Sequence, residues 1–241
     1  MDLSIFFSPA EAVRAERTLR KIAQHDVSRW AITGGLAIEI HILRRGGESL
    51  TRPLHDIDFM TSSFDAIPAS LGKELLLRHV HPHDPPGRNM LQGIAPETGI
   101  RIDVFRAYGS EMERLVPVTI AGLRLQMVSH EDLVARHARL NCDLLDGNFV
   151  APKFARDFLR MIDLVTPDAL DSIWQEHRKP RQPKSFSQTL IHLRQAIAMR
   201  TDLLVSPTYS TDVHEVCERC EKVEDFPLTN ASQILAILGY C

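Results

Sequence analysis

Hydrophobic residues follow two different periods along this chain. In the first half, short apolar runs between polar turns predict strands, and apolar residues at helical spacing predict helices between them. The expected strands are 30–33, 55–59, 90–94, 100–105, 115–120 and 123–128. The expected helices are 9–25, which follows the capping-box sequence Ser8-Pro9-Ala10-Glu11, then 36–44 and 64–77. This half therefore predicts a mixed α/β fold.

The second half shows only the helical period. Helices are expected from Ser129 to about Cys142, around Phe154 to Val165, and over 167–177, 187–200, 211–223 and 230–238. The change of period predicts two domains, an α/β domain over residues 1–128 with a short mixed sheet and a helical domain over 129–241. The predicted fold class is α/β (α+β), followed by helices.

Composition changes this picture little. The chain has 241 residues, of which 44% are hydrophobic and 24% charged, as in soluble globular proteins. Its net charge of −3 argues against a molecule that binds nucleic acid through its overall charge. It has no apolar run of membrane-spanning length and no signal-peptide pattern at its start, so we expect a cytoplasmic protein. Four cysteines in such a chain indicate no disulfide framework.

The chemistry concentrates in the strand around Asp56 and Asp58. Successive side chains of a strand point to opposite faces, so these two carboxylates share one face while Ile57 and Phe59 take the other. Two like charges on one face repel unless a cation lies between them, and Mg²⁺ prefers such oxygen ligands. A third carboxylate, Asp103, lies in another apolar run, and a glycine pair lies upstream. The pattern indicates metal-assisted phosphoryl chemistry.

These motifs, in this order, resemble the nucleotidyltransferase superfamily over about residues 28–106. The matching segments are Thr33-Gly34-Gly35, Ala37-Ile38-Glu39, Thr51-Arg52-Pro53 and His55-Asp56-Ile57-Asp58-Phe59. The resemblance is strongest to the lincosamide and aminoglycoside nucleotidyltransferases, and the toxin-type enzymes of abortive-infection systems follow closely. It departs from the superfamily in having Gly35 where Ser is frequent, and in a slightly longer spacer over residues 44–50.

The resemblance implies roles for single residues. Asp56, Asp58 and Asp103 would be the catalytic and metal-binding carboxylates, with two Mg²⁺ ions expected and Asp103 either completing the metal site or accepting a proton. The residues expected to contact the nucleotide are Thr33, Gly34, Gly35, Arg52 and Lys153. The glycines would let backbone N–H groups at a helix N-terminus approach phosphate. Lys153 with Asp157 resembles a Lys-x-x-x-Asp element of the toxin-type enzymes, but an ordinary ion pair on a helix surface is the favoured explanation of the pair.

The implied reaction is the transfer of a nucleoside monophosphate from an NTP to a hydroxyl group, with release of pyrophosphate. A small, antibiotic-like molecule is the favoured acceptor. The alternatives are a toxin-type transferase that acts on RNA or protein, and an inactive module that binds a nucleotide or a partner. The basic segment 177–184 keeps the RNA acceptor open. The histidine-rich segment His79–Asp84 and the pair Cys217/Cys220 are expected to be an exposed loop and two buried thiols.

Overall fold

The computed structural model describes residues 1–48, 54–63, 67–68, 70–71, 75–78, 90–205 and 226–227. Several sequence predictions fall outside these residues. They are Arg52, the segment His79–Asp84, the pair Cys217/Cys220 and the helices expected over 211–223 and 230–238.

One mixed sheet contains every strand of the described residues. Its order is β6-β7-β1-β2-β5-β4-β3-β8. The strands are β1 (Trp30–Thr33), β2 (Asp56–Thr61), β3 (Leu76–Arg78), β4 (Met90–Ala95), β5 (Ile100–Arg106), β6 (Val116–Ile120), β7 (Leu123–Met127) and β8 (Phe226–Pro227). Strand β2 runs antiparallel to β1 and parallel to β5. The predicted α/β class with a short mixed sheet is confirmed.

The helices of the described residues follow the apolar periodicity of the sequence. They are α1 (Pro9–Ile22), α2 (Gly34–Arg44), α3 (His130–Asn141), α4 (Pro152–Ile162), α5 (Asp171–His177) and α6 (Phe186–Met199). Short 3₁₀ helices are η1 (Leu3–Ile5), η4 (Glu111–Glu113), η5 (Cys142–Leu144), η6 (Pro167–Leu170) and η7 (Thr201–Leu203). As predicted, α3 begins after Ser129, whose hydroxyl accepts a hydrogen bond from the Asp132 N–H.

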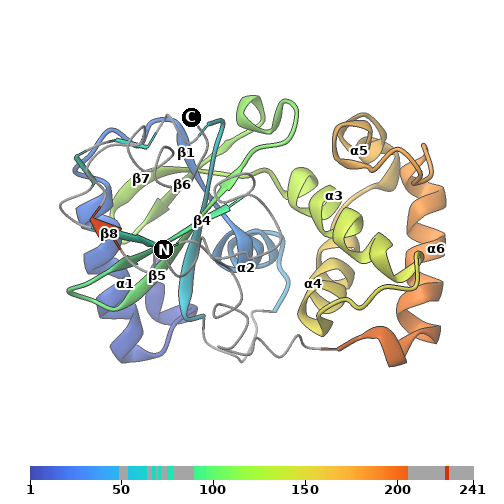
Figure 1. Cartoon of the computed structure of the whole chain (residues 1–241), viewed down its shortest axis with the longest axis horizontal. Helices are drawn as coiled ribbons and strands as arrows, with labels where there is room; N and C mark the ends of the chain where they lie inside the picture. Colours follow the sequence, from blue (N-terminus) through green and yellow to red (C-terminus); the bar gives the residue numbers. More distant parts are fainter. Residues whose placement is uncertain are drawn as a thin grey trace.

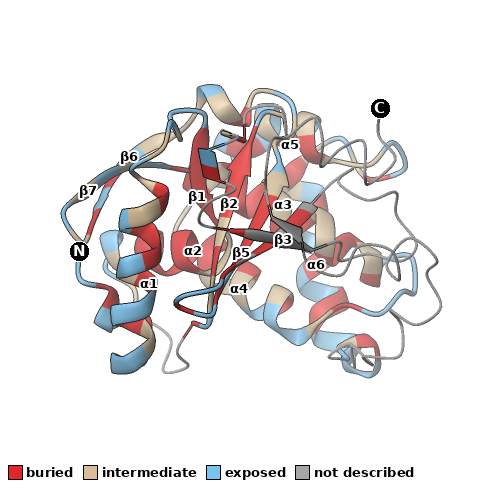
Figure 2. Ribbon diagram, turned by 60° about the vertical axis from the view of Figure 1, so that its left-hand side comes forward, coloured by how far each residue is buried: buried red, intermediate tan, exposed pale blue. Residues whose placement is uncertain are grey.

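Figure 1 shows the strands and α1 on the left, α3 to α6 grouped on the right, and α2 between them. Helix α2 is buried along most of its length, from Leu36 to Ile42, because it packs on β2 and also on α3 and α4. Figure 2 shows the same region as the core, with β1, β2, β5 and α2 largely buried and the outer side of α1 exposed. Trp30 and Trp174 are both buried.

Ion pairs hold the two groups of elements together. Arg160 of α4 contacts Glu39 in the middle of α2, with 2.6 Å between Nη1 and Oε1. Beyond the end of α2, Arg45 donates to Glu131 of α3 and, at 2.9 Å, to the carbonyl oxygen of Leu164. These contacts place the C-terminal ends of α2 and α4 side by side.

Three local predictions were wrong. The helix expected over 64–77 fails at its end, where Leu76 and Leu77 form part of β3, because a short apolar run fits a strand as well as a helix. The Ser8 side chain does not cap the backbone of α1 but donates to the Glu11 carboxylate. The helix expected over 167–177 begins as the 3₁₀ helix η6 and becomes α-helical only at Asp171.

None of the helices in the described part of the chain is both long and apolar enough to cross a membrane.

Candidate active site

The pairing of β2 with β5 brings the three predicted carboxylates together. The two strands are parallel, and Asp58 lies directly opposite Asp103 in the register. Partners in register point to the same face of a sheet, so Asp56, Asp58 and Asp103 share one face. Ile57 and Phe59, which alternate with the aspartates, are buried on the other face as the sequence predicted. The site is therefore encoded by strand alternation and one strand pairing.

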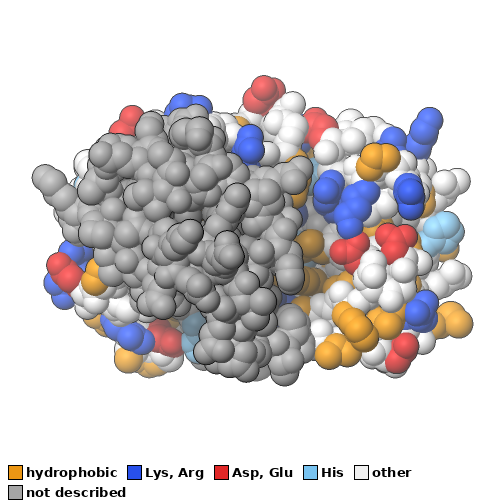
Figure 3. Space-filling model, viewed as in Figure 1, with side chains coloured by type: hydrophobic (Ala, Val, Ile, Leu, Met, Phe, Trp, Pro, Cys, Tyr) orange, Lys and Arg blue, Asp and Glu red, His pale blue; other side chains and the backbone are white. Residues whose placement is uncertain are grey.

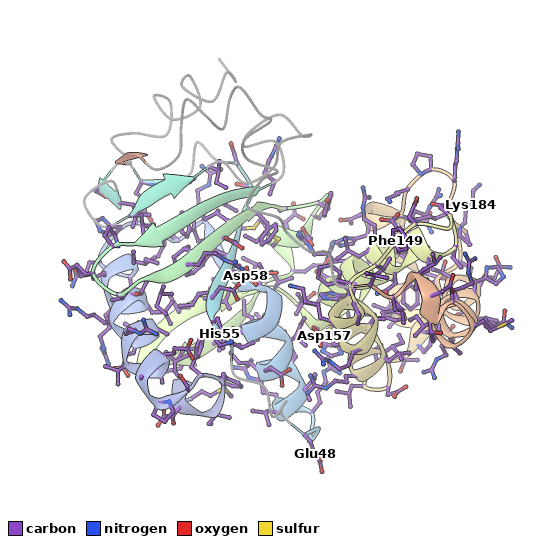
Figure 4. The ribbon with its side chains drawn as sticks, turned by 60° about the horizontal axis from the view of Figure 1, so that its bottom comes forward. Glu48, His55, Asp58, Phe149, Asp157 and Lys184 are labelled. Carbon is purple, nitrogen blue, oxygen red and sulfur yellow. The ribbon has the colours of Figure 1, made fainter. Side chains whose placement is uncertain are left out.

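One carboxylate oxygen from each of Asp56, Asp58 and Asp103 lies within 4.8 Å of the others. Asp103 is buried, and the other two aspartates are partly exposed. Figure 4 shows Asp58 at the N-terminal end of α2. Asp157, which belongs to α4, lies beside α2. His55, which precedes the motif, is outside the cluster because its Nδ1 lies 2.7 Å from the Glu11 carboxylate on α1.

Gly34 lets α2 begin directly against Asp58. Its φ of +57° is a left-handed conformation that L side chains rarely adopt. A Cβ atom at this position would lie 1.8 Å from Oδ2 of Asp58, far inside van der Waals contact. Thr33, the residue before it, is the buried N-cap of α2 and pairs with Asp58 across β1 and β2. The turn and the carboxylate thus fit each other only if residue 34 has no side chain.

Asp58 is the electrostatically strained member of the cluster. Burial and the neighbouring charges of Asp56 and Asp103 raise the pKa of Asp58 to about 8. A backbone hydrogen bond from Gly35 and the charge of Arg101 act in the opposite direction but do not offset this rise. Within the described part of the chain, the cluster therefore carries more negative charge than its neighbours compensate.

Arg101 is a member of the site that the sequence analysis missed. It lies opposite Asp56 in the β2–β5 register. Its guanidinium contacts Asp56 through Nη2, and its Nε lies 3.4 Å from Oδ2 of Asp103. The signal was present in the alternation Arg101-Ile102-Asp103, which places the arginine and the aspartate on one face of the strand.

Among the other predicted nucleotide contacts, Lys153 is not brought into the cluster by any described contact, whereas Gly35 is. Lys153 is exposed on the first turn of α4, where its ammonium lies 5.1 Å from the centre of the Phe154 ring. The Gly35 N–H, expected to face a phosphate, is donated to Asp58. Asp157 lies three residues before Arg160 on α4, with 4.0 Å between its Oδ1 and Nη1 of the arginine, and burial raises the pKa of Asp157.

A second acidic group, Glu111, Asp132 and His177, lies buried between the sheet and the helices. It is internally compensated, unlike the aspartate cluster. Arg114 donates to both oxygens of Asp132, Arg136 donates to Glu111, and His177 Nε2 lies 3.1 Å from Asp132. Burial alone would raise the pKa of Asp132, but hydrogen bonds from His177, Arg114 and Ser129 lower it to about 2. We interpret this group as structural.

No protein family and no curated protein matches the sequence. Solved structures give several matches. An antigenic nucleotidyltransferase-like protein from Paracoccidioides brasiliensis is 18% identical, with a TM-score of 0.44 over 82% of this chain and 94% of that one. Polyadenylate synthase of Megavirus is 11% identical, with a TM-score of 0.43 over 65% of this chain and 32% of that one.

The lincosamide antibiotic adenylyltransferase LnuA, solved with lincomycin, is 12% identical, with a TM-score of 0.40 over 62% of this chain and 98% of that one. The last of these proteins is by name a lincosamide-modifying enzyme, and lincosamide nucleotidyltransferases are among the enzymes that the sequence motifs resemble. Because the identities and TM-scores are low, the functional assignment depends on the residues of the site.

Proposed function

We propose that this protein is a nucleotidyltransferase, which moves a nucleoside monophosphate from an NTP to a hydroxyl group and releases pyrophosphate. The observation that carries the proposal is the set of three carboxylates on one face of β2 and β5, within 4.8 Å of one another. A glycine turn whose missing side chain makes room for Asp58 supports it. Three like charges so close together lower the stability of the fold, whereas a bound cation would use all three carboxylates as ligands.

The residues present fit Mg²⁺. Asp56, Asp58 and Asp103 offer hard oxygen donors, and burial together with the charges of the other two aspartates raises the pKa of Asp58, a cost that a bound cation would relieve. Bound there, one or two Mg²⁺ ions would offset the charge of the triphosphate and stabilise the pyrophosphate leaving group. Asp103 is the innermost of the three, so it serves either as the third ligand or as the acceptor of the hydroxyl proton.

For the nucleotide we retain Thr33, Gly34, Gly35, Arg52 and Lys153 as proposed contacts. The packing of α4 on α2 through Arg160 and Glu39 supports a role for Lys153, because it places the helix of Lys153 beside the helix that begins at the carboxylates. Helix N-termini favour anions, so the start of α2 suits a phosphate group.

A small molecule with a hydroxyl group is the acceptor that we favour over RNA. The basic segment 177–184 would be the part of this chain to contact an RNA backbone. Within it, Lys179 pairs with Asp143, and Arg178 donates to Gln175 at 2.9 Å and to the carbonyl oxygen of Gln182 at 3.2 Å. Figure 3 shows Lys and Arg side chains beside acidic ones on the helical side of the molecule. The charge of Lys179 is thus already balanced by Asp143, and the guanidinium of Arg178 is already engaged in hydrogen bonds within the chain.

The first test is calorimetric titration of the four NTPs, with and without Mg²⁺, into wild type and into the double variant Asp56→Ala/Asp58→Ala. We expect at least one NTP to bind only with Mg²⁺, and this binding to vanish in the double variant because the ligands of the metal are gone. A competent NTP then enters a transfer assay with labelled α-phosphate, in which small hydroxyl compounds and RNA are compared as acceptors.

Asp163→Ala is the matched control, because this aspartate is 66% exposed and pairs with Arg194 on the helical side. It should bind the NTP as wild type does. Binding that needs no Mg²⁺, or that survives in the double variant, would contradict the proposed site. Metal-dependent binding without transfer to any acceptor would instead favour the inactive nucleotide-binding module.

A further inference from the structure

Arg101 occupies a particular place in the carboxylate cluster. It pairs with Asp56 across β2 and β5, and it precedes Asp103 by two residues on β5, so it shares the face of both aspartates. Its guanidinium reaches Asp56 through Nη2 and Asp103 through Nε, at 3.4 Å from Oδ2. A single cationic group thus spans two of the three proposed metal ligands.

The way in which Arg101 is held differs from that of the structural arginines. Its side chain is 48% exposed, whereas those of Arg160 and Arg136, which pair with buried glutamates, are 20% and 13% exposed. Of its two partners, Asp56 is 28% exposed and Asp103 is buried. An ion pair open to solvent contributes little to stability, so the contact with Asp56 can be broken at small cost. A buried pair is costly to break because a charge is left without its partner. Arg101 is therefore a removable counter-ion.

We propose that Arg101 is the built-in competitor of the metal ion at this site. In the absence of metal it compensates Asp56 and Asp103, and a divalent cation has to displace it from both. The inference rests on the proposed function, since it takes the three aspartates as metal ligands. Arg101 would act as a positioning residue that sets how much free Mg²⁺ the site requires before it loads.

The experiment is calorimetric titration of Mg²⁺, without nucleotide, into wild type, Arg101→Gln, Arg101→Lys and Arg106→Gln. Without its competitor the Arg101→Gln site should bind Mg²⁺ about tenfold more tightly, the equivalent of about 1.4 kcal/mol. Arg101→Lys keeps the charge but cannot span two carboxylates with a planar group, so its affinity should lie between the two.

Arg106→Gln is the matched control for net charge. Arg106 lies on the same strand but is exposed and, five residues along, points to the opposite face, so its loss should leave Mg²⁺ affinity at the wild-type value. A second readout is thermal unfolding. Metal-free Arg101→Gln should melt below wild type, because the carboxylates lose their counter-ion, and its melting temperature should rise more when Mg²⁺ is added.

The outcomes separate this inference from the function on which it rests. If wild type binds Mg²⁺ and Arg101→Gln binds it no more tightly, the competitor role of Arg101 is overturned while the metal site stands. If Arg101→Lys matches wild type, the nearby positive charge alone sets the affinity, and the spanning contact is overturned. If neither wild type nor Arg101→Gln binds Mg²⁺, the inference and the proposed metal site fail together.

Discussion

At the scale of single residues, Gly34 and Asp58 form the tightest fit in the proposed site. Gly34→Ala should abolish Mg²⁺-dependent NTP binding, because its Cβ would overlap the Asp58 carboxylate and force it out of the cluster. Calorimetry with Mg²⁺ and NTP measures the binding, and urea unfolding measures the cost in stability.

Gly46→Ala is the matched control for Gly34→Ala. Gly46 also has a left-handed φ, +81°, but a Cβ there would meet nothing within 4 Å. It should cost about 1–2 kcal/mol of unfolding free energy through backbone strain alone and leave NTP binding intact. A Gly34→Ala protein that binds NTP as wild type does would contradict the geometry of the turn.

The raised pKa of Asp58 has a consequence for pH dependence. Folded, metal-free protein keeps a proton on Asp58 up to a pH of about 8, whereas the unfolded chain releases it near 3.8. Between these values the folded state binds the extra proton, so stability falls as the pH rises. Asp56 and Asp103 cause this together with burial, and Arg101 opposes it.

Asp58→Asn should therefore melt at a higher temperature than metal-free wild type, and the gap should widen from about pH 5 to about pH 8. The asparagine carries no charge to bury, which is the physical reason. Thermal unfolding in the presence of a chelator measures the gap, with Asp163→Asn as the exposed control. A gap that stays constant over this pH range would contradict the strained carboxylate.

Much of the site was predictable from sequence, and the reason is local. Strand alternation alone puts Asp56 and Asp58 on one face, and the order of the motifs linked them to Asp103 and to the glycine turn. The position of Arg101 required the β2–β5 register, which depends on contacts between distant segments. The donation of the Gly35 N–H to Asp58 also depends on how the turn meets the strand, and no pattern in the sequence indicates it.

At the scale of elements, the buried charges between η4, α3 and α5 connect the sheet to the helices. Asp132 at the start of α3 binds Arg114 and His177 and is itself fully buried. Asp132→Ala should lower the free energy of unfolding by about 3–5 kcal/mol, because it takes this partner from the half-buried guanidinium of Arg114 and from the buried ring of His177. Urea unfolding followed by circular dichroism measures the loss.

Asp163→Ala is again the control, with an expected loss of about 0–1 kcal/mol for an exposed ion pair. Equal losses in the two variants would contradict the structural role of the buried group. In that case Glu111, Asp132 and His177 would have to be reconsidered as a functional cluster.

The elements themselves were predicted well where the pattern is long or bounded by turn residues. The hairpin of β6 and β7 and the helices α3, α4 and α6 lie within a few residues of their expected places. The failure at Leu76 and Leu77 has a physical cause, since these two residues owe their strand to pairing with β4 and β8. Strand pairing of this kind is determined by tertiary contacts, which a short window of sequence does not contain.

At the scale of the whole molecule, the division into domains 1–128 and 129–241 stays a prediction. The contacts favour one cooperative unit, because Arg160 joins α4 to Glu39 of α2 and Arg45 joins the end of α2 to Glu131 of α3. The two tryptophans provide a test, since Trp30 lies in β1 and Trp174 in α5.

Trp174→Phe leaves a probe in the sheet, and Trp30→Phe leaves one among the helices. In each variant, urea unfolding followed by tryptophan fluorescence should coincide with unfolding followed by circular dichroism, as for a two-state protein. Each variant is its own control, because both signals come from one sample. Fluorescence transitions that differ from the circular dichroism curves would support two domains that unfold separately.

The fit between Gly34 and Asp58 also constrains how this sequence can evolve. While Asp58 is present, any residue with a Cβ at position 34 collides with its carboxylate. Replacement of Asp58 by alanine removes the collision with the carboxylate, and the Cβ of residue 58, 2.7 Å away, and the strain of the left-handed turn remain as obstacles. A lineage that abandons the site should therefore lose the carboxylate first and the glycine later. Relatives that retain Gly34 without Asp58 would mark recent decay of the activity, and relatives without either would mark an older loss.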